Sequence, residues 1–395
     1  MARKRVMVLY ETAGGGHLAN ARAIHAAMAE RHPHVDVELV HLADELGSQR
    51  IRAVFSSYNA LLKSDPRLVK VGFKFINRLD LEPLVYRVFT KARRNLQESI
   101  RRHRPDLIVS VFGVGNTATP MALEHVGWRH RVPFLVFCTD MTTDFLRGWV
   151  SDEADGMVAL TPDAAGQLVA YGYPADRILT LPGLPVHPAF IHQEGDQQSS
   201  RQEFGLDPDK FTVLVTMGGV AVRNAWRVSR VLAATELPIQ VIVACGRNGM
   251  LERKVRRLAE RAGPSFKVMG HTDRMASLMR ASDLIVAKPG PGTIAEAIQM
   301  ARPLLIDASR EAMPQEKGNL EYLIARGLCE PILEMDALPK MIRRHIEDPD
   351  LHAKAVDRLV QARRPEAILQ LVDWIVSRIP ERGQTRPLDS AAVEG

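Results

Sequence analysis

Residues 282–297, SDLIVAKPGPGTIAEA, decide the fold because a buried strand, a glycine turn and a helix start follow one another directly. Residues 284–287 are a short apolar run, which is typical of a strand buried on both faces. Proline and glycine at residues 289–292 end that strand, and a helix pattern restarts at Thr293. The free N–H groups and the dipole of such a helix start favour an anion. The stretch therefore predicts an α/β domain with an anion site at the carboxyl end of a strand.

A plain helix start is the alternative explanation of this stretch. Thr293 and Glu296 have the spacing of a capping box, which satisfies two backbone donors without any ligand. A second polar cluster, PQEKGN at residues 314–319, favours a ligand site instead. Carboxylates and amides bind hydroxyl groups, so the cluster suits a ribose and a hexose. The side chains that can line one crevice are Glu296, Gln315, Glu316 and Asn319.

The two motifs together resemble the donor half of the monogalactosyldiacylglycerol synthase family. The octapeptide at residues 290–297 and the pattern QExGN at residues 315–319 are the matching motifs, and the resemblance extends from Val6 to near Ile379. Processive diacylglycerol glucosyltransferases and the peptidoglycan lipid-intermediate GlcNAc transferases share this layout. The families contain inverting enzymes that move a hexose from a UDP-sugar to a lipid. The resemblance therefore implies the α/β GT-B fold, with two doubly wound Rossmann-like domains facing a cleft.

Three segments of the chain follow from this resemblance. Residues 1–190 are the expected N-terminal acceptor domain, which faces the membrane and binds diacylglycerol. Residues 203–370 are the expected C-terminal UDP-sugar donor domain, after a polar linker within residues 183–202. Residues 371–395 are expected to hold the end of a helix that crosses back to the first domain, and a disordered tail.

The expected donor site lies after the strands of the C-terminal half. Gly218 and Gly219 follow a predicted strand and can bring N–H groups onto a phosphate, although a tight turn without a ligand is the alternative. Arg247 follows the next strand and is expected to bind the diphosphate or nucleotide, or else to pair with a helix end. Glu296 is expected on the ribose. The complete donor set implied is Gly218, Gly219, Arg247, His271, Thr272, Gly290, Gly292, Thr293, Glu296, Gln315, Glu316 and Asn319, with the last three on the hexose.

A glycine loop followed by a histidine marks the N-terminal half. Residues 6–10 are an expected buried strand, and a helix is expected from Leu18 to Arg31. The loop spacing does not match the G-x-G-x-x-G pattern of dinucleotide sites. His17 lies at the helix N-terminus, where the dipole keeps the ring neutral, although an exposed histidine is the alternative. The motif GGGH at residues 14–17 matches the acceptor side of the glycolipid synthases. The resemblance implies that His17 is the general base, with Gly15 and Gly16 beside the acceptor.

Polar residues also follow the strand predicted within residues 132–138. Asp140 is expected to have a structural or acceptor-orienting role, or to orient His17, rather than to bind a metal, since no neighbouring residues complete a coordination set. Asp140 and Trp149 resemble the family pattern, which implies a catalytic role for Asp140 and an acceptor-side position for Trp149. Ser151 and His187 depart from that pattern, where a histidine and an arginine are usual.

Apolar and basic residues alternate over residues 51–104. Basic amphipathic helices are typical of proteins that bind an anionic membrane surface. A helical insertion that packs on its own domain is the alternative, and nucleic acid is not expected because no RNA-binding motif accompanies the charge. The family resemblance favours the membrane.

Composition sets the outer bounds of this interpretation. The 395 residues, 46% of them hydrophobic and 25% charged, favour two ordinary globular domains. The net charge of +6 favours anionic partners. The three cysteines, Cys138, Cys245 and Cys329, fit neither a disulfide framework nor a zinc site. No apolar run approaches the ~20 residues of a membrane span. The expected location is cytoplasmic, peripheral on the inner face of the cell membrane.

The expected reaction transfers a hexose from UDP-galactose or UDP-glucose to the hydroxyl of 1,2-diacylglycerol. No cofactor or metal is expected, since the UDP-sugar is a substrate. Three alternatives remain open: UDP-GlcNAc transfer to a polyprenyl-linked peptidoglycan precursor, a UDP-sugar epimerase, and a non-catalytic nucleotide-binding module. Galactose and glucose differ only in the configuration at O4, so the sequence does not separate these donors.

Overall fold

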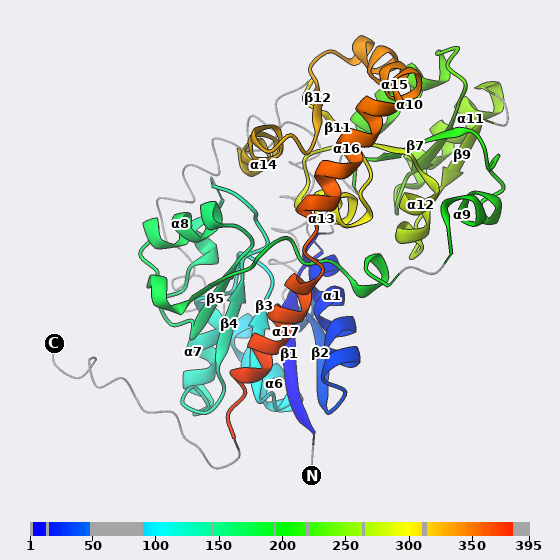
Figure 1. Ribbon diagram of the computed structural model, residues 1–395. Coiled ribbons are helices and arrows are strands. Elements are labelled where there is room, and N and C mark those ends of the chain that lie inside the picture. Colours follow the sequence, from blue (N-terminus) through cyan, green and yellow to red (C-terminus); the bar gives the residue numbers. More distant parts are fainter. Residues whose placement is uncertain are drawn as a thin grey trace.

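Two parallel six-stranded sheets with flanking helices form the two lobes of the molecule (Figure 1). The computed structural model describes residues 3–12, 16–47, 90–143, 145–192, 195–218, 222–262, 265–309 and 314–381. The predicted α/β class with two doubly wound domains is confirmed. Residues 51–89, most of the predicted membrane-binding segment, and the tail from residue 382 lie outside the described residues.

The first sheet reverses its strand order between β1 and β3. All its strands are parallel, and the central ones are short apolar runs buried on both faces. In spatial order they are β2 (Val35–His41), β1 (Lys4–Tyr10), β3 (Leu107–Ser110), β4 (Phe134–Phe137), β5 (Gly156–Ala159) and β6 (Ile178–Thr180). The helices of this half are α1 (Gly16–Arg31), α2 (Leu42–Leu46), α6 (Thr90–His103), α7 (Ala118–His125) and α8 (Pro162–Ala170), with 3-10 turns η1 (Arg147–Trp149), η2 (Ala175–Arg177) and η3 (Pro188–Phe190). Ligands of such sheets bind where the strand order reverses, at the carboxyl ends of the strands.

The second sheet reverses its strand order between β10 and β7. In spatial order its strands are β12 (Glu330–Ile332), β11 (Leu304–Asp307), β10 (Leu284–Ala287), β7 (Phe211–Thr216), β8 (Ile239–Ala244) and β9 (Phe266–Met269). The apolar run at residues 284–287 forms a strand with the predicted bounds, and the strand expected before Arg247 is β8. The helices are α9 (Gln197–Glu203), α10 (Val222–Ala233), α11 (Gly249–Ala262), α12 (Met275–Ala281), α13 (Pro291–Met300), α14 (Pro314–Ala325) and α15 (Leu338–Glu347), with the 3-10 turn η4 (Met335–Ala337).

Two consecutive helices return the chain to the first lobe. Helix α16 (Pro349–Ala362) packs on α13 and α15, and α17 (Glu366–Ser377) packs on α1 (Figure 1). Asp373 of α17 bonds to Arg31 at 3.2 Å and to His32 at 2.7 Å. The Trp374 ring covers Gly156, where an added Cβ would lie 2.8 Å from the ring. Helix α17 begins at Glu366 and ends at Ser377, so its end lies within residues 371–395, where the end of a crossing helix is expected.

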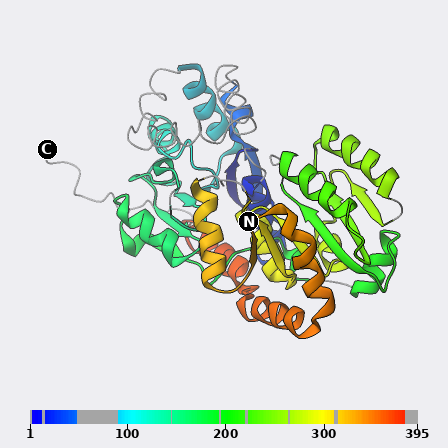
Figure 2. The same ribbon diagram turned by 90° about the horizontal axis from the view of Figure 1, so that it is seen from above.

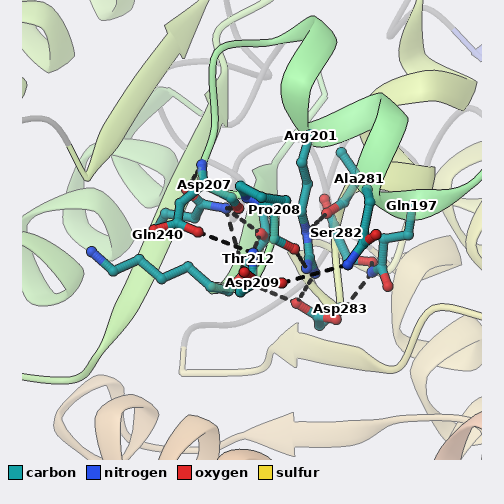
Figure 3. Close-up of polar contacts among 12 residues, drawn as sticks. Gln197, Arg201, Asp207, Pro208, Asp209, Thr212, Gln240, Ala281, Ser282 and Asp283 are labelled. Carbon is teal, nitrogen blue, oxygen red and sulfur yellow. Dashed lines mark hydrogen bonds and ion pairs between the residues drawn. The ribbon is translucent and has the colours of Figure 1, made fainter.

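A buried ion pair attaches α9 to the second domain (Figure 3). The Arg201 guanidinium contacts Asp283 Oδ2 at 2.5 Å and donates to the Ala281 carbonyl at 2.9 Å. Asp283 also accepts the Thr212 N–H at 2.6 Å and the Gln197 amide at 3.0 Å. Because Thr212 and Asp283 lie at the amino ends of β7 and β10, this network is at the edge of the sheet opposite the strand carboxyl ends. Helix α9, part of the predicted linker, is therefore packed on the second domain.

Helix α6 is the described part of the predicted membrane-binding segment. Its apolar residues Leu96 and Ile100 are buried in the core of the first domain. Helix α6 therefore packs its apolar side on its own domain, as the alternative to membrane binding predicted. Its exposed side includes Lys91, Arg94 and Arg101. None of the helices in the described ranges combines the length and the apolar character needed to cross a membrane.

Candidate functional site

The carboxyl edges of the two sheets meet at the junction of the lobes. Helix α1, which follows β1, contacts α13, which follows β10. Helix α14 lies on the side of the second lobe that is nearer the first (Figure 1), and Figure 2 shows it along its length. Thr142 Oγ1 of the first domain donates to Asn319 Oδ1 of α14 at 3.0 Å. The residues that the sequence places after separate strands are thereby brought to one region.

His17 lies in the first turn of α1 with one ring nitrogen bound to the backbone. Its Nδ1 is 2.9 Å from the Val111 carbonyl oxygen, which can only accept, so Nδ1 holds the proton and Nε2 presents a lone pair. Thr139 Oγ1 is 3.1 Å from the same nitrogen. The ring packs edge-on against Phe112 and tilted against Trp149, with centroid distances of 5.0 and 5.9 Å. Burial lowers the pKa of His17 to about 4, against the opposing effect of the Val111 bond. The ring is neutral at pH 7.

Asp140 is bound to Trp149 rather than to His17. The Trp149 indole Nε1 donates to Asp140 Oδ2 at 2.8 Å, and the Trp149 side chain is buried. Burial raises the pKa of Asp140 to about 6; the Trp149 bond lowers it and the nearby Glu316 raises it further. His17 is therefore oriented by donating to the Val111 carbonyl. This differs from the expectation that Asp140 orients His17. In the described part of the chain, no group of three or more His, Cys, Asp or Glu side chains is placed to hold a metal ion.

Helix α13 begins with uncapped backbone donors. Gly290 is its N-cap and Pro291 its first residue, and among the described residues no side chain caps this helix start. The capping-box alternative for Thr293 and Glu296 is therefore wrong, because the helix starts two residues before Thr293. An added Cβ on Gly292 would have no neighbour within 4 Å, so the loop borders open space. The dipole end and the free N–H groups favour an anion at this place.

Glu296 lies one turn into α13, half-buried on its crevice side. Burial alone raises the pKa of its carboxyl to about 8. Among the described residues, no ion pair or hydrogen bond to this carboxyl is recorded. Another side of the same helix faces the core, since Ile294 and Ala297 are fully buried and Ile298 is 7% exposed. A desolvated carboxyl at a helix start is suited to bind ligand hydroxyl groups.

Helix α14 contributes an ion pair and a bridging amide. Glu316 pairs with the Lys288 ammonium that follows β10. Asn319 is buried; its Nδ2 donates to the Pro289 carbonyl at 2.9 Å while its Oδ1 accepts from Thr142. The Asn319 amide therefore joins the loop before α13 to the first domain, which differs from a purely sugar-binding role. An added Cβ on Gly318 would lie 2.5 Å from Thr142 Oγ1, so the backbones approach closely here.

The remaining predicted donor residues lie around the ends of β7, β8 and β9. Arg247 Nη2 and His271 Nε2 are 3.3 Å apart, so these two residues are neighbours. Thr272 Oγ1 accepts the Arg274 N–H at 3.0 Å and closes a turn. Gly218 has a φ of +65°, which favours glycine, and is exposed. Gly15, Gly219 and the side chain of Gln315 lie outside the described residues; Gly16 opens α1 with free space at its Cβ position.

The sequence analysis did not predict three groups that contact the candidate site residues. Lys288 had a visible signal, because it is the first charged residue after an apolar strand and precedes the glycine turn. Thr142 and the Val111 carbonyl had none, since their partners lie far away in the sequence. Two residues depart from the family pattern, Ser151 and His187. Ser151 is buried, and His187 Nδ1 accepts the Ala189 N–H at 3.1 Å.

Comparison with known proteins supplies independent findings. Residues 17–186 match the family model described as monogalactosyldiacylglycerol (MGDG) synthase, and residues 212–366 match the glycosyltransferase family 28 C-terminal domain. The probable monogalactosyldiacylglycerol synthase 2, chloroplastic, of Oryza sativa subsp. japonica is 28% identical over 340 residues, covering 82% of this chain and 70% of the relative. The processive diacylglycerol beta-glucosyltransferase of Bacillus subtilis (strain 168) is 25% identical over 377 residues, covering 93% and 94%.

A solved structure agrees on the fold. The crystal structure of Acinetobacter baumannii MurG aligns with a TM-score of 0.58 at 15% identity, covering 95% of this chain and 99% of that one. The GT-B architecture is confirmed.

Proposed function

The chain belongs to the monogalactosyldiacylglycerol synthase family of glycosyltransferases, and on this premise we propose that it transfers galactose or glucose from the UDP-sugar to the hydroxyl of 1,2-diacylglycerol with inversion. The observation that supports this most strongly is the state of His17. Its Nδ1 is committed to the Val111 carbonyl and its ring is neutral, so Nε2 is available to accept a proton. A neutral imidazole at the mouth of a crevice is a suitable general base for a hydroxyl nucleophile.

The reaction is a single displacement at the anomeric carbon. The acceptor oxygen forms a bond to C1 of the hexose while the bond from C1 to the β-phosphate oxygen breaks. The acceptor proton moves to Nε2 of His17, and the electron pair of the broken bond leaves with UDP. Because the nucleophile attacks opposite the leaving group, the configuration at C1 inverts.

The second domain supports the leaving group in this proposal. Negative charge grows on the diphosphate as the bond to C1 breaks. The uncapped N–H groups and the dipole of α13, together with the Gly218 turn, face the point where β7 and β10 reverse order. Glu296 accepts the ribose hydroxyls, while Glu316 contacts the hexose. No cofactor takes part.

The acceptor lies in a bilayer, so the enzyme would work as a peripheral protein on the inner face of the cell membrane. A net charge of +6 favours an anionic lipid surface. The exposed basic residues of α6, Lys91, Arg94 and Arg101, would add to this attraction. Their apolar neighbours are buried, so α6 would contribute charge rather than an apolar anchor.

The test is UDP release with UDP-galactose, UDP-glucose or UDP-GlcNAc, with and without diacylglycerol in anionic vesicles. We expect release that requires the lipid and one of the first two donors. His17→Ala should lower kcat by about 10²–10⁴-fold while UDP still binds. His25→Ala is the matched control, because His25 is an exposed histidine of the same helix. Release without lipid, an epimerised nucleotide sugar, or full activity of His17→Ala would contradict the proposal. The anomeric configuration of the product, measured by NMR, tests inversion.

A further inference from the structure

Lys288 lies at the carboxyl end of a central strand of the second domain. It follows β10 directly, next to the point where the strand order reverses between β10 and β7. An added Cβ on Gly218 would lie 3.3 Å from Lys288 Cε, and one on Gly290 would lie 3.5 Å from both Cε and Nζ. The lysine side chain therefore lies between the two glycine turns. An ammonium in that position places a full positive charge beside a ligand that both turns would hold.

The Lys288 ammonium already has a carboxylate partner. It forms an ion pair with Glu316 Oε1 in the first turn of α14. The side chains are 26% and 15% exposed, so the pair is better shielded from water than an ion pair on the surface. An ammonium has three N–H donors, and this contact uses one of them. Glu316 is also close enough to Asp140 across the crevice to raise its pKa.

We propose that Lys288 binds the diphosphate of the donor, and that its ammonium changes partner from Glu316 to the phosphate oxygens when the donor binds. This inference rests on the proposed UDP-hexose donor. The exchange releases the Glu316 carboxylate, which then accepts the hexose hydroxyls. One side chain thereby links the filling of the diphosphate position to the formation of the sugar contact.

The same position suits the departure of UDP. The lysine keeps its proton throughout, and its charge stabilises the negative charge that develops on the β-phosphate oxygen. The backbone beside it is held in place, since the Pro289 carbonyl accepts from Asn319, which is bound in turn to Thr142 of the first domain. The ammonium can therefore move between two anionic partners while its Cα stays fixed relative to both domains.

The experiment measures UDP and uridine binding by calorimetry for wild type and three variants. Lys288→Met removes the charge and keeps an unbranched chain; it should weaken UDP binding about 10–100-fold, as expected for one charge-assisted hydrogen bond, and leave uridine binding unchanged. Lys317→Met is the matched control, because Lys317 lies on α14 next to Glu316 but is exposed and pairs only with Glu321 at 3.5 Å among the described contacts. Glu316→Gln removes the competing charge and should tighten UDP binding about 3–10-fold.

Each of these binding measurements supports or overturns one part of the proposal. Normal uridine binding by Lys288→Met shows that the variant is folded. Unchanged UDP binding by this variant, or an equal loss in Lys317→Met, would overturn the role of Lys288. Weaker UDP binding by Glu316→Gln would overturn the exchange, since Glu316 would then support Lys288 rather than compete for it. Failure of the wild type to bind UDP would overturn the proposed function itself, so the two failures are distinguishable.

Discussion

Thr142 and Asn319 are joined by a hydrogen bond of 3.0 Å that crosses between the two domains. Asn319 also donates to the Pro289 carbonyl at 2.9 Å, in the loop that precedes α13. Since Thr142 lies in the loop after β4, the first domain helps to set the position of the loop before α13. The arrangement of the two domains is therefore part of the proposed donor site.

The closest backbone approach in this junction gives the first prediction. An added Cβ at Gly318 would lie 2.5 Å from Thr142 Oγ1 and 3.2 Å from its Cβ, so Gly318→Ala should displace Thr142 and disturb its bond to Asn319. We expect kcat/KM to fall at least about tenfold, because a displacement near 1 Å can cost that much or more, with little change in Tm. Gly166→Ala in α8 is the control, since its added Cβ meets nothing within 4 Å. An unchanged kcat/KM for Gly318→Ala would contradict this prediction, because it would show that the contact between Gly318 and Thr142 is not needed for activity.

Proton release should accompany UDP binding. Burial raises the pKa of Glu296 to about 8, so the carboxyl is mostly protonated at pH 7. Ribose hydroxyls that donate to it favour the ionised form and lower the pKa in the complex. We expect release of most of one proton at pH 7 and affinity that rises with pH up to about 8. Calorimetry in buffers of different ionisation enthalpy measures the release. Glu296→Gln should release none, and proton uptake by the wild type would contradict the assignment.

The titration of Asp140 should respond to both of its neighbours. The Trp149 bond lowers the pKa of Asp140 and Glu316 raises it, around a value of about 6. Trp149→Phe should therefore raise this pKa, while Glu316→Gln should lower it. Carbon-detected NMR of labelled aspartate follows the titration directly. Shifts of the same sign in both variants would mean that a change in burial outweighs the two specific contacts.

His17 should make stability depend on pH. Its pKa is about 4 in the folded protein against 6.5 in the unfolded chain, so between these values the unfolded state binds the extra proton. The wild type should therefore lose stability relative to His17→Gln as pH falls from 6.5 toward 4, by about 1–2 kcal/mol at pH 5. Urea denaturation at pH 7 and pH 5 gives the comparison. Equal pH dependence of the two proteins would show that the ring is solvated in the folded state.

The buried pair of Arg201 and Asp283 should contribute to stability rather than to catalysis. Arg201→Met leaves the Asp283 carboxylate with its charge uncompensated, at a cost of about 3–5 kcal/mol (Figure 3). UDP binding should persist at temperatures where the variant is folded, because the pair lies at the amino ends of the strands. Arg256→Met, which breaks an exposed ion pair with Glu252 within α11, is the control and should cost less than about 0.5 kcal/mol. A similar loss of unfolding free energy in the two variants would show that the Arg201–Asp283 pair is no better shielded from water than the exposed pair.

Local sequence patterns were sufficient to predict the fold class and the strand and helix that flank the glycine turn at residues 289–292. Residues 284–287 form a strand with the predicted bounds, because a strand buried on both faces is an apolar run that ends at turn residues. The capping box at Thr293 was predicted as an alternative and is wrong, because Pro291 starts the helix earlier. His17 could be predicted at the helix start from its glycine loop, although the hydrogen bond that orients it could not.

The sequence by itself determined which residues follow which strands, and so which side chains could reach the carboxyl edges of the two sheets. Only the tertiary structure decided their partners and their ionisation. Asn319 meets Thr142 from 177 positions away, and Trp149 rather than His17 holds Asp140. The pKa values of His17 and Glu296 are shifted chiefly by burial. Desolvation and contacts between distant segments arise from the assembled fold, so no local pattern of residues encodes them.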